Sequence, residues 1–142
     1  MTAVTVLPAE AATFDVAVDV VIVGGGGCGL TAAIAAQQGG AASLVIERDA
    51  TPSGSTGMST GLIPGAGSQL QSAAGVADSA QLFASDVLAK AKQQTDADIV
   101  RELAEASGET IDWLVAAGVQ LSLVDSFLYP GHSVHRMHGT KN

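Results

Sequence analysis

One stretch of the sequence, residues 19–47, constrains the fold of this chain more than any other. It reads DVVIV, then GGGGCG, then an alanine-rich run, then two further glycines, and finally SLVIE, which ends at Glu47. A continuous apolar run is typical of a strand that is buried on both faces, and the glycines after it open a helix. The stretch therefore predicts a βαβ unit that carries the dinucleotide-binding fingerprint.

The glycines of this fingerprint have separate tasks. Gly24 allows the tight turn out of the strand, Gly26 lets the backbone approach a pyrophosphate, and Gly29 allows the helix and the strand to pack closely. The unpaired N–H groups of residues 26–29 would face the phosphates, with the positive end of the helix dipole behind them. We expect Cys28 to be a small buried residue rather than a redox thiol, because the chain has no second cysteine.

The carboxylate of Glu47 completes the fingerprint at the end of the second apolar run. There it can accept hydrogen bonds from both ribose hydroxyls of an adenosine. The same charge would repel a 2′-phosphate, so NADP is disfavoured. The fingerprint by itself leaves FAD and NAD open as ligands.

A second informative stretch, residues 51–68, reads TPSGSTGMSTGLIPGAGS. Its glycine, serine and threonine content would suit a flexible linker. However, Met58 and the run Leu62–Pro64 interrupt the polar residues, which indicates a loop folded against another part of the protein. Its bare backbone N–H groups and small hydroxyls would suit a second phosphate or the polar edge of a flat ring.

Together these segments resemble the FAD-dependent flavoproteins of the fumarate reductase and succinate dehydrogenase type, which include 3-ketosteroid dehydrogenases. The resemblance is carried by DVVIVGGGGCGL at residues 19–30, by Glu47 and Arg48, and by SGSTGMSTG at residues 53–61. It implies FAD as the cofactor and an α/β, Rossmann-like FAD-binding βαβ unit with following helices.

Carried over by position, the resemblance implies contacts of the second stretch with the flavin. Its first part would meet the diphosphate and ribityl chain, and its last part would line the isoalloxazine ring. The cofactor-binding residues that we expect are Gly24, Gly26, Gly27, Cys28, Gly29, Glu47, Arg48, Gly54, Ser55, Thr56, Ser59, Thr60 and Gly61. Family members with covalent flavin carry a histidine before the small-residue run. No histidine occurs before His132 here, so we expect non-covalent FAD.

The resemblance also implies a reaction, namely hydride transfer between flavin and an activated C–C or C=C bond. Fumarate-like dicarboxylates and 3-ketosteroids are both compatible substrates. The alternatives are a catalytically inert nucleotide-binding fragment and an NAD-binding Rossmann domain. The catalytic residues are unknown, and we expect them to lie beyond Asn142.

Downstream of the loop, three amphipathic patterns predict helices: residues 78–94, a segment from Asp96 onward, and a third around residues 111–114. At helical spacing, Phe83 and Trp113 are expected to pack in the core rather than to contact a cofactor. A possible further strand covers residues 119–124. We expect so few strands to leave an uncovered sheet through which the chain could self-associate.

The segment of residues 126–142 contains three histidines spaced three residues apart. This spacing could place them on one helix face as metal ligands, but flanking glycines leave little room for a helix, so no metal site is expected. Arg136 and His138 match a family phrase that leads into the substrate-side domain. The resemblance implies a place for them near the flavin edge or the substrate mouth, and an exposed tail is the alternative.

Length and charge set outer limits on the protein. The chain has 142 residues and a net charge of −8, which argues against nucleic acid and anionic membranes as partners. A single cysteine and the lack of a basic leader favour the cytoplasm. We expect an extension at 1–15, an FAD-binding domain at 16–125, and at 126–142 the start of a segment leading to a missing substrate domain. The domain would then be truncated.

Overall fold

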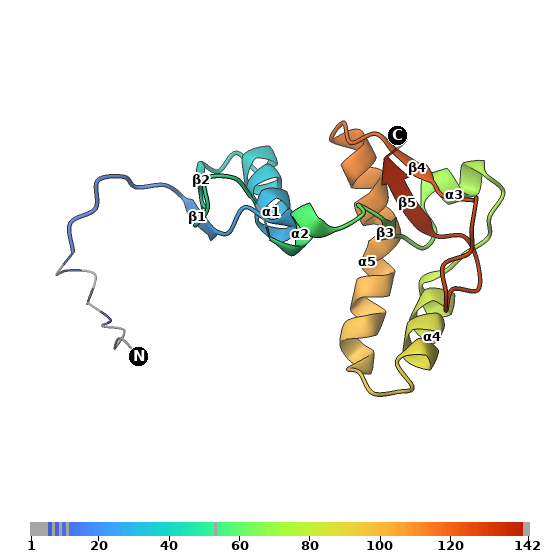
Figure 1. Ribbon diagram of the computed structural model, residues 1–142. Coiled ribbons are helices and arrows are strands. Elements are labelled where there is room, and N and C mark those ends of the chain that lie inside the picture. Colours follow the sequence, from blue (N-terminus) through green and yellow to red (C-terminus); the bar gives the residue numbers. More distant parts are fainter. Residues whose placement is uncertain (1–5, 7, 9, 11, 53, 141–142) are drawn as a thin grey trace. The chain divides into compact units, whose positions relative to one another are not determined.

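The computed structural model describes residues 6, 8, 10, 12–52 and 54–140. The chain divides into two compact units, Met1–Ser59 and Thr60–Asn142 (Figure 1). Within the described ranges, no helix is both long enough and apolar enough to cross a membrane.

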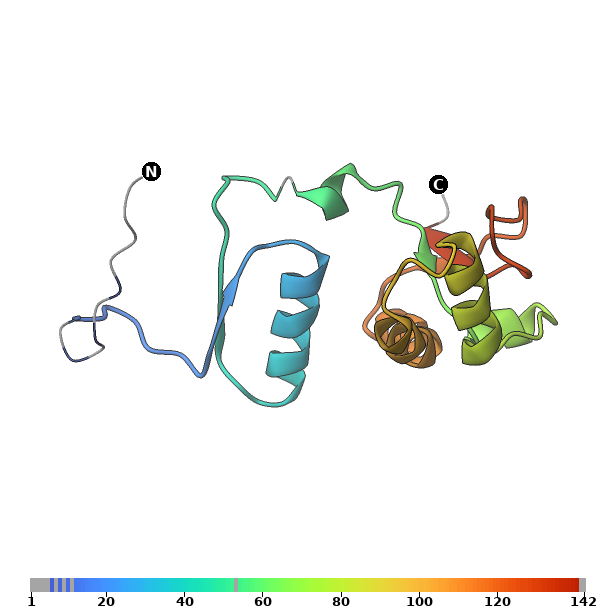
Figure 2. The same cartoon turned by 90° about the horizontal axis from the view of Figure 1, so that it is seen from below.

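The first unit is the predicted βαβ element. Its secondary structure is β1 (Val20–Val23), α1 (Gly27–Gln38), β2 (Ser43–Ile46) and the short α2 (Ser55–Met58). The two strands pair in parallel, with Ile22 opposite Val45, and Figure 2 shows α1 running alongside them. The mixed helix and strand class expected from the sequence is confirmed.

Close approach between helix and strand depends on one glycine. A Cβ at Gly29 would lie 1.9 Å from the carbonyl oxygen of Gly24, so no larger residue fits where α1 begins. Gly24 itself has a φ of 106°, in the region that favours glycine. The fingerprint glycines therefore fix how the chain leaves β1 and enters α1.

The two-stranded sheet is covered on one face only. Ile22 is buried, whereas Val21, Val23, Leu44 and Ile46 are between 41% and 85% exposed. Alternate residues of a strand point to opposite faces, so these four side chains share the face away from Ile22. The expectation that β1 is buried on both faces is wrong for the described residues.

The second unit combines a three-stranded antiparallel sheet with three helices. Its elements are β3 (Ile63–Pro64), α3 (Gln69–Ala73), α4 (Ala80–Lys90), α5 (Ala97–Ala116), β4 (Leu121–Leu123) and β5 (Met137–Thr140). The strand order is β3-β5-β4, so the C-terminal strand is central. The possible strand at 119–124 corresponds to β4. The alternative of an exposed tail is wrong for residues 136–139, which are buried, whereas residues 126–131 are exposed.

The core of this unit lies between α4 and α5. It consists mainly of small side chains around one aromatic ring: Ala66, Phe83, Ala84, Val100 and Ala104. Phe83 is 8% exposed, which confirms its predicted core position. Trp113, also expected in the core, is half-buried on α5.

A single helix, α5, replaces two of the predicted ones. It begins after Asp96, whose carboxylate accepts hydrogen bonds from the N–H groups of Asp98 and Ile99. It continues through Gly108, where a Cβ would lie 2.2 Å from the carbonyl oxygen of Ala66. Glycine weakens a helix locally, but here it lets the β3–α3 loop lie against α5, so the helix is not interrupted.

Candidate functional site

The turn between β1 and α1 presents a helix N-terminus with little side-chain cover. Gly26 is the N-cap residue of α1 and offers no side chain to cap it. The first N–H groups of any helix lack intrahelical acceptors, and the helix dipole makes them attractive to anions. Gly26 is the N-cap, and Gly27 and Gly29 lie in the first turn of α1; their contact with phosphate stays a prediction.

Glu47 holds its carboxylate against this turn. Its Oε2 accepts a hydrogen bond from the Gly25 N–H at 2.7 Å, and its Oε1 accepts one from the Asp49 N–H at 3.1 Å. These bonds, the one from Gly25 first, lower the pKa of Glu47, so the side chain is charged at neutral pH. A carboxylate has about four lone-pair sites, and acceptor capacity therefore remains for a ligand hydroxyl.

Gly25 is the residue that sequence reasoning missed. A Cβ at this position would lie 3.1 Å from Glu47 Oε2, so the space that a side chain would need is taken by the carboxylate. The signal was present in the unbroken run of four glycines at 24–27, of which only Gly24 and Gly26 have a place in the general fingerprint.

The loop after β2 returns to the same helix N-terminus. Thr56 Oγ1 accepts a hydrogen bond from the Gly27 N–H at 3.0 Å, and a Cβ at Gly26 would lie 3.7 Å from that oxygen. This contact across 29 residues shows that the segment at Thr56 is folded against the fingerprint, as the interrupted polar pattern indicated.

Four other predicted residues lie at the short helix α2 or just after β2. Gly54 is the N-cap of α2, Ser55 is its first residue, and Ser59 is its C-cap. Arg48 is exposed and pairs with Asp49 at 3.2 Å, and this contact raises its pKa.

Three points limit the agreement between sequence and structure at this site. Thr60 and Gly61 belong to the second unit, so they are not brought together with the fingerprint within one compact unit. Ser53 lies outside the described residues. The prediction that Cys28 is buried is wrong: the thiol is exposed, and the neighbouring Gly29 is the residue of this turn that packs against Gly24 and Ile22.

In the second unit, Arg136 is fully buried among acidic and aromatic side chains. Its guanidinium donates to both carboxylate oxygens of Asp78, at 2.9 and 3.0 Å, and to Asp86 at 2.7 Å. The same group lies 4.8 Å from the centre of the Phe83 ring. These contacts make Arg136 an interior link between β5 and α4, and its predicted place near the flavin stays a prediction.

His138 is also fully buried. Its Nε2 lies 2.8 Å from Ser68 Oγ, and this oxygen also accepts a hydrogen bond from the Gln71 N–H. Burial lowers the pKa of His138. The three histidines do not share a helix face, because His138 lies in β5. The described residues contain no group of side chains able to hold a metal ion.

Comparisons with known proteins bear on this geometry. The family described as FAD binding domain matches residues 19–140. The cytochrome-type fumarate reductase of Shewanella frigidimarina is 34% identical over 121 residues, which cover 85% of this chain and 21% of that protein. The urocanate reductase of Eggerthella lenta is 32% identical over 128 residues, covering 89% and 21%. The chain thus spans about a fifth of the length of these curated relatives.

Two solved structures resemble the chain in fold as well as in sequence. An open conformation of a flavocytochrome c3 fumarate reductase has a TM-score of 0.74 at 31% identity, covering 83% of this chain and 21% of that one. The 3-ketosteroid-Δ4-(5α)-dehydrogenase of Rhodococcus jostii RHA1, in complex with 4-androstene-3,17-dione, has a TM-score of 0.69 at 34% identity, covering 78% and 23%.

The first unit fits the cofactor of this family on its own chemistry. It offers first-turn helix amides for phosphates, beside the Gly27 N–H that Thr56 already accepts, glycines that leave the backbone bare, and a charged carboxylate next to them. The resemblance noted in the sequence and the expectation of FAD are both confirmed. The chain belongs to the FAD binding domain family, and its relatives include fumarate reductases and a 3-ketosteroid dehydrogenase.

Proposed function

We propose that this chain holds the adenosine diphosphate half of FAD at its β1–α1 turn and serves a flavin-dependent oxidoreductase. The observation that carries the proposal is the position of the Glu47 carboxylate, fixed by the Gly25 N–H beside the N-terminus of α1. An acceptor for ribose and donors for phosphate therefore lie on adjacent residues of one compact unit. No other part of the first unit combines these two properties among its described residues.

Each residue has a binding task in this proposal. The first-turn amides of α1 receive the pyrophosphate, and Glu47 accepts the ribose hydroxyls. The hydroxyl oxygen of Thr56 already accepts the Gly27 N–H, which supports the view that an oxygen ligand fits at this turn. Gly54 and Ser55 precede Thr56 in the same loop and extend the phosphate and ribityl contacts, while Arg48 lies at the adenosine end.

We infer the reaction class from the relatives. When bound, FAD supplies hydride transfer, and the protein orients the cofactor and its partner. The named relatives act on fumarate, urocanate and a 3-ketosteroid. A C–C or C=C bond next to a carbonyl or carboxylate is the feature these compounds share, and we propose that substrate class here.

Cofactor binding is tested by titrating FAD into the 142-residue chain and following flavin fluorescence. We expect saturable binding that Glu47→Ala weakens about tenfold or more, since a charge-assisted hydrogen bond contributes roughly 1.5–3 kcal/mol. Glu109→Ala, which removes an exposed carboxylate from α5, is the matched control and should leave the affinity within twofold. An FAD affinity that is unchanged in Glu47→Ala, or absent in a folded chain, would refute the proposed site.

A second experiment separates an oxidoreductase from an inert nucleotide-binding module. The FAD-loaded chain is photoreduced without oxygen, with EDTA as the electron donor, and is then mixed with fumarate, urocanate or 4-androstene-3,17-dione. Reoxidation of the flavin by one of them supports the reaction class, whereas tight FAD binding without reoxidation favours the module.

A separate experiment shows whether FAD is attached covalently. We propose that FAD is bound non-covalently, because no histidine precedes His132. Acid precipitation of the loaded chain should therefore release all flavin into the supernatant. Flavin retained in the pellet would contradict this.

We also propose a cytoplasmic location and neither nucleic acid nor membrane as partner. The single cysteine suits a reducing compartment, and the net charge of −8 opposes binding to polyanions. Cell fractionation and a DNA-binding assay at low salt test these two statements.

A further inference from the structure

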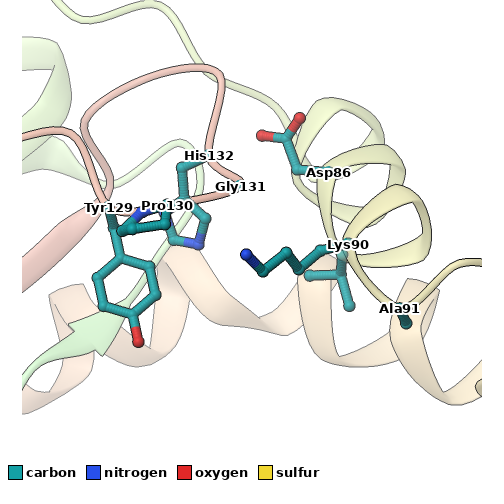
Figure 3. A pocket seen from close by; sticks show the side chains of 8 residues that line it. Asp86, Lys90, Ala91, Tyr129, Pro130, Gly131 and His132 are labelled. Atoms are coloured by element: carbon teal, nitrogen blue, oxygen red, sulfur yellow. The ribbon is translucent and has the colours of Figure 1, made fainter.

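A pocket in the second unit has no part in the FAD proposal. It has a volume of about 370 Å³ and lies between the end of α4 and the loop of residues 129–132. In Figure 3 the ammonium group of Lys90 points across the opening toward the ring of His132, with the ring of Tyr129 on the far side. Pockets of this volume are at the lower end of the range that binds small molecules.

The loop that forms one wall is held in a defined conformation. Asp86 accepts hydrogen bonds from the backbone N–H of Ser133 at 2.7 Å and from its hydroxyl at 2.6 Å. The His132 N–H donates to the carbonyl oxygen of Tyr129 at 2.9 Å. Gly131 has a φ of 95°, and a Cβ there would lie 3.0 Å from Lys90 Cδ, so the lysine stem lies along the glycine backbone. The wall therefore exists before any ligand arrives.

The lining of the pocket carries one acidic and one basic side chain, Asp86 and Lys90. The Asp86 carboxylate, although it lines the pocket, is already bound to Ser133 and to the buried guanidinium of Arg136. Lys90 has no ion-pair partner among the described residues. Burial, followed by the nearby charge of Arg136, lowers the pKa of His132 and keeps it neutral. The ammonium group of Lys90 is thus the charge left for a ligand.

Aromatic rings give the pocket a flat side. The ring centre of His132 lies 5.2 Å from that of Tyr129 and 5.8 Å from that of Phe83, the second pair edge to face. The ring of His132 is therefore fixed from two sides. Its Nδ1 is buried and has no hydrogen-bond partner among the described residues.

We propose that this pocket binds a small planar carboxylate of about the size of benzoate. The carboxylate would pair with the ammonium of Lys90, and the flat apolar body would lie against Val87 and the rings of Tyr129 and His132. Charge complementarity selects an anion, and the ring-lined wall selects a flat one over an aliphatic one. All residues of this site belong to the second unit, and none of them is part of the nucleotide fingerprint.

The proposal is tested with the uniformly ¹⁵N-labelled 142-residue chain, titrated with sodium benzoate at constant ionic strength. We expect saturable shifts of the amide signals of Gly131, His132 and Ala91. Lys90→Gln should weaken binding about tenfold, as the loss of a charge-assisted contact predicts. Lys92→Gln is the matched control: this lysine is two residues further on, is exposed and does not line the pocket. The affinity of this variant for benzoate should stay within twofold of that of the parent chain.

Sodium acetate, titrated in the same way, tests the flat wall. It carries the same charge without a ring and should bind at least tenfold more weakly than benzoate. Three outcomes would overturn the proposal: no saturable shift at these residues in a folded chain, an equal loss in Lys92→Gln, or acetate binding as tightly as benzoate.

Discussion

At the scale of single residues, Gly25 and Glu47 depend on each other. The carboxylate takes its position from the Gly25 N–H, and it fills the volume where a side chain at residue 25 would lie. The neighbouring carboxylate thus favours glycine at this position, because a Cβ would force Glu47 to shift, whereas the dihedral angles of residue 25 do not call for glycine. The position of the Glu47 carboxylate is set in part by a residue that bears no side chain.

We therefore predict that Gly25→Ala weakens FAD binding about tenfold while the chain stays folded. The added Cβ would sit 3.1 Å from Glu47 Oε2 and push the carboxylate away from the turn. Fluorescence titration gives the affinity and circular dichroism the fold. Gly39→Ala, where the nearest atoms would be 3.4 Å away, is the control and should bind as the parent does.

Arg136 provides the second prediction at this scale. Both of its partners, Asp78 and Asp86, have side chains that are no more than 11% exposed. Arg136→Met would leave two buried carboxylates without a counter-charge and lower the free energy of unfolding by about 3–5 kcal/mol. Urea denaturation measures this.

The comparison for Arg136 is a surface ion pair. Arg101→Met removes the partner of Asp98, and the two side chains are 56% and 88% exposed. Its effect should stay below about 1 kcal/mol. Equal losses in the two variants would show that the buried pairs contribute no more than an exposed one.

At the scale of elements, the sequence predicted whether a segment is a helix or a strand better than it predicted where the segment ends. The strand, glycine turn and helix of residues 20–38 were predicted because the apolar run and the fingerprint glycines are local signals. The continuity of α5 was not predicted, because a glycine such as Gly108 usually indicates a helix end. Its contact with Ala66, which explains the glycine, cannot be seen in the sequence. The pairing of β5 with β3 and β4 was not predicted either, because β3 is distant in sequence and no local pattern indicates which strands pair.

Gly108 also yields a prediction for α5 as a whole. In an isolated helix, Gly108→Ala would stabilise by about 1 kcal/mol. In this protein we expect it to destabilise by about 1–3 kcal/mol, because the Cβ would meet the carbonyl oxygen of Ala66 at 2.2 Å. Thermal or urea denaturation shows whether the substitution raises or lowers the free energy of unfolding. Glu109→Ala, at the exposed position that follows, should change stability by less than 0.5 kcal/mol in either direction.

For the whole molecule, the uncovered face of the β1–β2 sheet matters most. Val21, Val23, Leu44 and Ile46 form an exposed apolar surface beside unpaired strand edges. Such surfaces favour association. We predict that the chain forms oligomers at micromolar concentration, measured by size-exclusion chromatography with light scattering.

The variant Val23→Lys should shift this equilibrium toward the monomer. Leu103→Lys, at a residue of α5 that is 66% exposed, is the control and should leave it unchanged. A parent chain that remains monomeric at all concentrations would contradict the prediction.

The central position of β5 has a consequence for how the second unit comes to be folded. Its strand joins β3 and β4, and Arg136 just before it meets Asp78 across 58 residues of chain. Contacts so distant in sequence are slow to form, because a long loop must close first. During synthesis, α4 and α5 leave the ribosome before β5 does. We therefore expect the sheet and the buried charge cluster to form only after β5 has emerged, with Asp78 and Asp86 hydrated until then.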